Sequence, residues 1–140
     1  MNFKRAYKEL YKLGIPENKY YLNGLYGSTS DEERLSLIES RGKYTVEYEV
    51  YYRERGEKGS ARTFTNEDQA IDYFITELFS EFLSARISSK DISGTTGNER
   101  LFLTGMSDLF DKLKKTNKSR AAQLLKALGF DKKSIEELVK

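Results

Sequence analysis

Apolar and polar positions near the amino terminus follow a helical period. Large apolar residues recur three and four positions apart, and the sequence Gly14-Ile15-Pro16 then ends the pattern. This spacing predicts an amphipathic helix over residues 2–13. Its apolar positions are Phe3, Tyr7, Leu10, Tyr11 and Leu13.

Between residues 20 and 64 the period changes to two, and glycines punctuate the apolar stretches. This pattern predicts an antiparallel sheet of three to four strands. The clearest strand is expected at residues 44–53, between strands at 34–40 and 61–64, with 20–25 as the candidate fourth. Alternation should bury Tyr44, Val46, Tyr48, Val50 and Tyr52, and should turn Thr45, Glu47, Glu49, Tyr51 and Arg53 toward solvent or a partner.

A second helical pattern follows the strands. Asn66 with Gln69 three positions later is typical of a helix N-cap, and an apolar stripe continues to about residue 87. We therefore expect a long helix that packs on the sheet. Its stripe is Ile71, Phe74, Ile75, Leu78, Phe82 and Leu83.

The last third of the chain is predicted to be helical. Residues 88–98 are rich in Ser, Thr and Gly and should form a linker. Three helices are expected here. The first covers residues 101–113 and is broken at Gly105, the second covers 117–128 and ends at Gly129, and the third covers 132–139 and is capped by Asp131. The prediction is thus an α+β domain at 1–87, the linker 88–98, and a helical segment at 99–140 that packs on the domain as one globular unit.

The composition excludes most catalytic and redox chemistry. The chain has no histidine and no cysteine, so the commonest general base, metal ligand and thiol nucleophile are all missing. We expect no enzyme activity, no cofactor, no metal and no disulfide, and the absence of cysteine favours a reducing, cytoplasmic compartment. Neither a signal-peptide pattern nor a membrane-spanning apolar stretch is present. Glu47 with Glu49, and the cluster at 31–33, are carboxylates that keep a surface soluble more often than they bind Mg²⁺.

Charge is unevenly distributed. Residues 111–140 contain 9 basic and 4 acidic residues, and residues 1–110 contain 15 and 18. A solvated helix face is the favoured explanation of the basic end. The alternative is a regulator that binds nucleic acid through Lys112, Lys114, Lys115, Lys118, Arg120 and Lys126.

Aromatic and basic residues concentrate at residues 44–55, which contain four tyrosines and two arginines. Tyrosine and arginine are enriched where proteins bind other proteins. Core packing is favoured for Tyr44, Tyr48 and Tyr52, whereas Tyr51 suits either role. The candidate binding residues are Glu47, Glu49, Tyr51, Arg53 and Arg55.

This same stretch carries a resemblance to known proteins. Val50-Tyr51-Tyr52-Arg53-Glu54-Arg55-Gly56-Glu57-Lys58 leads into Phe64, an acidic helix cap, Ala70 and Tyr73-Phe74. Over about residues 5–85 the chain resembles the immunity proteins of bacterial polymorphic toxin systems, and immunity protein 59 in particular. The resemblance implies a protein that binds and neutralises a cognate secreted toxin domain, often a nuclease. A protein partner is therefore expected, rather than nucleic acid or a membrane.

Overall fold

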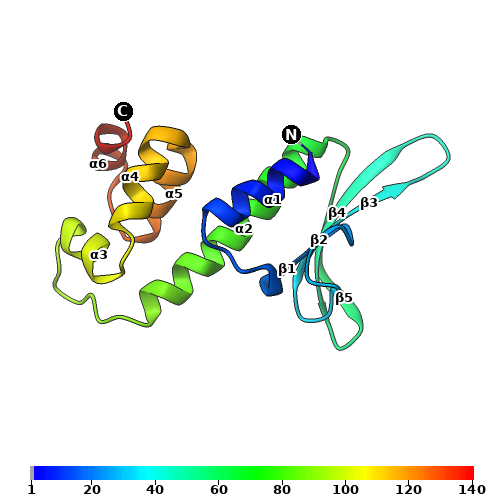
Figure 1. Ribbon diagram of the computed structural model, residues 1–140, viewed down its shortest axis with the longest axis horizontal. Coiled ribbons are helices and arrows are strands. Elements are labelled where there is room, and N and C mark those ends of the chain that lie inside the picture. Colours follow the sequence, from blue (N-terminus) through cyan, green and yellow to red (C-terminus); the bar gives the residue numbers. More distant parts are fainter. Residues whose placement is uncertain (1) are drawn as a thin grey trace. The chain divides into compact units, whose positions relative to one another are not determined.

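The computed structural model describes residues 2–140 (Figure 1). Contacts divide the chain into two compact units, of which unit 1 ends at Phe79 and unit 2 begins at Ser80. The boundary falls inside the long helix α2 (Glu67–Ser88). No helix within residues 2–140 is long and apolar enough to cross a membrane.

Helix α1 (Phe3–Lys12) forms as the sequence predicts. The Asn2 side chain caps it by accepting the Arg5 N–H at 2.9 Å, and Gly14 follows with a positive φ of 83°. Leu10 is fully buried, whereas Tyr11 is 74% exposed and lies outside the buried stripe.

Unit 1 contains a mixed five-stranded sheet in the order β2-β1-β3-β4-β5. A 3₁₀ turn (Glu17–Lys19) precedes the first strand. The strands are β1 (Tyr20–Leu22), β2 (Tyr26–Gly27), β3 (Leu35–Arg41), β4 (Val46–Glu54) and β5 (Glu57–Phe64).

The expectation of three to four antiparallel strands is wrong in two respects. The sheet has five strands, because residues 20–27 supply both β1 and β2, and β1 and β3 are parallel. After β1 the chain turns back as β2, and residues 28–34 then carry it to the other side of β1. A parallel pair needs a connection of about a dozen residues, which residues 23–34 provide. Apolar alternation marks both strands but does not specify their relative direction.

The β4–β5 hairpin differs from the prediction in length. Its loop is only Arg55-Gly56, with φ of 53° and 78°, the signs of a type I′ turn. The polar residues 57–60, expected to lie in a longer turn, belong to β5. The register shifts between Val50 and Tyr52, opposite Ser60, which has a positive φ of 52°. This bulge lets a polar, glycine-containing segment pair with β4.

One face of the sheet packs on α1 and α2. The Tyr20 and Phe74 rings meet edge to face at 6.1 Å, and Phe3 meets Tyr48 at 6.4 Å. Helix α2 begins as predicted, since the Asn66 side chain accepts the Gln69 N–H at 2.9 Å. Phe74 is completely buried, so the predicted packing of α2 on the sheet is confirmed.

Two tyrosines assigned to this buried face are exposed instead. Tyr44 is 86% exposed because β4 begins only at Val46, which leaves Tyr44 in the preceding turn. Tyr52 is 36% exposed, near the end of the strand and opposite Gly59. The prediction that both are buried is wrong.

Unit 2 is helical beyond α2. It contains α3 (Gly97–Leu103), α4 (Ser107–Thr116), α5 (Lys118–Ala127) and α6 (Lys132–Leu138). Gly105 and Gly129, with φ of 69° and 92°, follow α3 and α5 as expected, and Asp131 caps α6 by accepting the Ser134 N–H at 2.7 Å. Met106, Phe110, Leu113 and Leu124 are buried, but Phe102 is 78% exposed.

Candidate protein-binding surface

The predicted binding residues lie on β4 and in the turn that follows it, in different surroundings. Glu47 and Arg55 are exposed, and Glu49 and Arg53 are partly buried. Tyr51 is only 2% exposed, so the expectation that it points into solvent is wrong. A partner that approaches this face therefore meets charged groups and not the Tyr51 ring.

Tyr51 is surrounded by residues of β3, β4, β5 and the segment that precedes β3. It lies on the expected side of β4, opposite Ser36 of β3, which is itself fully buried. Its hydroxyl donates a 2.6 Å hydrogen bond to Oδ2 of Asp31, which belongs to the segment between β2 and β3. The Lys58 Nζ lies 4.6 Å from the ring centroid, and the Arg53 guanidinium carbon lies 5.6 Å away. Both distances suit cation–π attraction, so Tyr51 stabilises this corner of the sheet.

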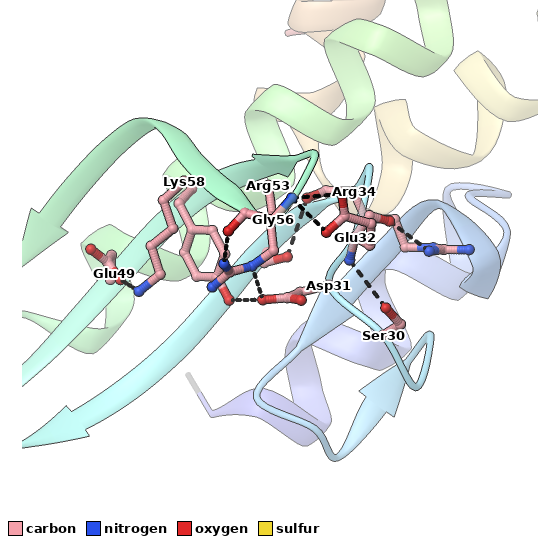
Figure 2. Close-up of polar contacts among 10 residues, drawn as sticks. Ser30, Asp31, Glu32, Arg34, Glu49, Arg53, Gly56 and Lys58 are labelled. Carbon is pink, nitrogen blue, oxygen red and sulfur yellow. Dashed lines mark hydrogen bonds and ion pairs between the residues drawn. The ribbon is translucent and has the colours of Figure 1, made fainter.

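Asp31 connects Tyr51 with the neighbouring charged residue on β4, Arg53. The same Oδ2 accepts the Nε–H of Arg53 at 2.9 Å (Figure 2). The Tyr51 hydroxyl, together with Arg53, holds the pKa of the Asp31 carboxyl below its usual range. Burial, reinforced by the bond to Asp31, raises the pKa of Tyr51 to about 12. At neutral pH Asp31 is ionised and Tyr51 is a neutral donor, which is the combination that the two bonds need.

The β4–β5 turn is held from two sides (Figure 2). Arg53 Nη1 donates to the Gly56 carbonyl at 2.7 Å, and the Gly56 N–H donates to Oε1 of Glu32 at 3.0 Å. Glu33 also donates its N–H to the Arg53 carbonyl at 2.7 Å. We call residues 54–57 the braced turn. The bracing holds Arg55 in a left-handed conformation that non-glycine residues seldom adopt.

A second ion pair continues this surface along the strand. Lys58 Nζ lies 2.7 Å from Oε1 of Glu49 (Figure 2). Exposed ion pairs contribute at most about 1 kcal/mol to stability, so their main effect is to fix where charge is presented. We call the side chains of Glu47, Glu49, Arg53, Arg55 and Lys58 the charged face.

The sequence did not predict the bracing residues. Arg34 fixes the same segment by donating Nε–H to the Asn18 carbonyl at 2.7 Å and Nη1–H to the Glu32 carbonyl at 2.7 Å. The acidic cluster at residues 31–33 was noticeable as a cluster. The pairing of this cluster with β4 could not be predicted, because Asp31 lies 22 positions from Arg53 in the sequence.

The basic helices of unit 2 differ from their predicted surface at one position. Arg120 is only 6% exposed, and its Nη1 donates to Oε1 of Gln123 at 2.9 Å, so it is not available to bind a phosphate. The other candidate cations are exposed: Lys112, Lys114, Lys115, Lys118 and Lys126.

Unit 2 also contains an open pocket of about 340 Å³ near the end of α5. Arg100 lies in its lining, where Nη1 donates to the Leu128 carbonyl at 2.8 Å and Nε to the Thr95 hydroxyl at 3.3 Å. A cation that caps the carbonyl end of a helix is stabilising. Arg100 therefore has a structural role in this pocket.

Among residues 2–140, no group of three or more Asp or Glu side chains is placed to hold a metal ion. The comparisons with known proteins give no relative, since no family model, no curated protein and no solved structure matches the chain.

Proposed function

We propose that this chain is an immunity protein that binds a cognate secreted bacterial toxin domain, a nuclease, and neutralises it by direct contact in the cytoplasm of the producing cell. The protein acts by binding and performs no catalysis of its own. The observation that carries the proposal is the braced turn beside the charged face.

Rigidity at this surface favours tight binding. Association costs free energy when loops and long side chains must become ordered, and a preorganised surface reduces that cost. Glu32 and Arg53 hold the peptide groups of Gly56 in place before any partner arrives. Arg55 has the left-handed conformation that a type I′ turn requires, and the hydrogen bonds to Gly56 keep this turn in one geometry.

The resemblance to immunity proteins supports the same surface. The stretch that carries it, residues 50–58, includes the end of β4, the braced turn and the first residues of β5. A nuclease must attract phosphate and therefore presents basic groups, which carboxylates such as Glu47 complement. Electrostatic complementarity of this kind mainly increases the association rate and the selectivity for one partner.

Co-expression with the toxin domain encoded next to this gene tests the proposal. We expect restored growth and a stable one-to-one complex on size-exclusion chromatography. Growth arrest that persists while this protein is abundant and folded would refute toxin neutralisation, as would a neighbouring gene that encodes no toxin.

A charge reversal with a matched control tests the surface. Glu47 on β4 and Glu77 on α2 are both exposed glutamates of unit 1. Glu47→Lys should slow association with the toxin and alter its dependence on salt, because it removes an attractive charge from the contact. Glu77→Lys, with the same change of net charge, should leave both unchanged. Equal association rates for the two variants, measured by surface plasmon resonance, would remove the charged face from the interface.

A further inference from the structure

The hairpin formed by β3 and β4 extends past its neighbours in the sheet. Strand β1 pairs with β3 only as far as Leu37, and β5 pairs with β4 only from Tyr48 onward. Beyond these positions Ser40 pairs with Glu47 and Arg41 with Val46, without a third strand. Figure 1 shows this cyan hairpin projecting beyond the other strands of unit 1. We call residues 40–47 the hairpin arm.

A tight turn closes the arm and presents two side chains at its tip. The Gly42 N–H donates to the Thr45 carbonyl at 2.8 Å, which leaves Lys43 and Tyr44 between the two ends. Tyr44 is 86% exposed, more than any other large apolar side chain in residues 2–140. The Lys43 Nζ lies 5.3 Å from its ring centroid.

Such a tip contributes little to the stability of its own fold. A two-stranded ribbon without a packed face is marginally stable in water, and an aromatic ring that stays exposed gains almost no burial. In interfaces the same residue type is a frequent anchor, because its large rigid area becomes buried at low entropic cost. The exposed Tyr44 ring adds little to folding, and its place at the end of a projecting arm makes it accessible to a partner.

The tip is also basic, although unit 1 as a whole is not. Arg41 and Lys43 flank the turn, and the Arg41 side chain is 74% exposed, with Glu39 as a distant ion-pair partner at 3.7 Å. Residues 1–79 contain 12 basic and 14 acidic residues. The complement of this tip is consequently a concave, acidic site with an apolar wall.

We propose that the hairpin arm inserts its tip into an acidic cleft of the toxin, with Tyr44 against an apolar wall and Arg41 and Lys43 facing carboxylates. This inference rests on the proposed function and specifies how inhibition occurs. Metal-dependent nucleases hold their ions with carboxylates at the catalytic centre, whereas the surrounding surface attracts phosphate and is basic. In a nuclease of this kind the arm blocks the catalytic cleft, and the exposed carboxylate of Glu47 at the base of the arm faces the basic rim.

Calorimetric titration of the toxin domain encoded by the neighbouring gene tests the arm. Tyr44→Ala should weaken binding about 30-fold or more, as expected for a buried anchor. Lys43→Glu should also weaken binding, and the loss of affinity should be larger at low salt than at high salt. The matched control is Tyr11→Ala, which removes a 74% exposed tyrosine from α1 and should leave affinity unchanged. Thermal unfolding of each variant confirms that the fold is retained.

Three outcomes separate the two proposals. If the wild-type protein binds the toxin, and Tyr44→Ala and Lys43→Glu bind it as tightly as the wild type does, the arm proposal fails and the proposed function stands. If the tip variants bind weakly but the saturated wild-type complex still cleaves nucleic acid, the tip lies outside the catalytic cleft and the assignment fails. If the wild-type protein does not bind the toxin at all, both proposals fail.

Discussion

The two units obtain order in different ways. In unit 1 the decisive contacts join residues far apart in sequence, such as Asp31 with Arg53 and the parallel pair of β1 and β3. In unit 2 many of the polar contacts lie within one turn, such as the capping box of Thr96 and Glu99. Unit 1 contains 12 basic and 14 acidic residues, and the remaining residues contain 12 and 8.

This difference shows that similar numbers of charges can serve different purposes. In unit 1 several charges pair with one another across strands and fix the surface around the braced turn. In unit 2 most of the lysines lie at exposed positions of the helices. Variants that remove a single long-range contact should therefore damage unit 1 more than the removal of several lysines damages unit 2.

The largest effect is expected from the core of unit 1. Phe74→Ala should destabilise the protein by about 3 to 5 kcal/mol, because it leaves a cavity under the sheet. Phe102→Ala in unit 2 is the matched control, since that ring is 78% exposed and its loss should change stability by less than about 0.5 kcal/mol. Denaturant unfolding of both variants measures the difference, and similar losses would show that the buried helix face is misassigned.

A smaller loss is expected when the Tyr51 hydroxyl is removed. Tyr51→Phe should cost about 1 to 2 kcal/mol, because the partly buried Asp31 carboxylate loses a donor. Tyr44→Phe removes a hydroxyl from an exposed ring and should be neutral. Equal stability of the two variants in urea would mean that the bond to Asp31 contributes nothing.

The same contact predicts a dependence on acid. Because the pKa of Asp31 is lowered in the folded protein, its contribution to stability is present above the ordinary value of 3.8 and is lost as the pH falls through the lower folded value. The stability difference between wild type and Asp31→Asn should be constant near neutral pH and should shrink below about pH 4. Urea unfolding at pH 7, 5, 4 and 3 measures it, and a constant difference throughout would contradict this assignment.

The smallest effect is expected from the basic helices. Replacing Lys114, Lys115 and Lys118 by Gln should change stability by less than about 0.5 kcal/mol and leave toxin binding intact. Affinity for a single-stranded oligonucleotide, measured across a salt series, checks the alternative role in nucleic-acid binding. If the oligonucleotide affinity of the wild-type protein falls steeply with salt and that of the triple variant does not, the nucleic-acid-binding alternative is favoured.

Helices were predictable from the sequence because their determinants are local. Asn66 with Gln69, Gly105 between α3 and α4, and Asp131 before α6 each signal a boundary through residues at most a few positions away. Strand β5 was underestimated because its first residues are polar and contain Gly59, and only pairing with β4 makes them extended.

The surface was harder to predict than the fold. Alternation identifies which side of β4 Tyr51 occupies, but it does not reveal what covers that side. The cover comes from Asp31, Lys58 and Arg53, of which Asp31 lies 20 positions away in the chain. Tyr44 was misplaced for a related reason, since the strand pattern continues into a turn where alternation no longer implies burial.

The parallel pairing of β1 with β3 has a consequence for the order of events during synthesis. At about 5 to 20 residues per second, Leu22 leaves the ribosome roughly one second or more before its partner Leu37. The antiparallel ribbon of β3 and β4 needs only a short loop closure and forms within microseconds once both strands are available. Strand β1 can pair with β2 at once, but its Tyr20 and Leu22, which are fully buried in the native sheet, stay uncovered until β3 and α2 have also been made. The first strand of the sheet therefore exposes its apolar side chains during synthesis for longer than any later strand does.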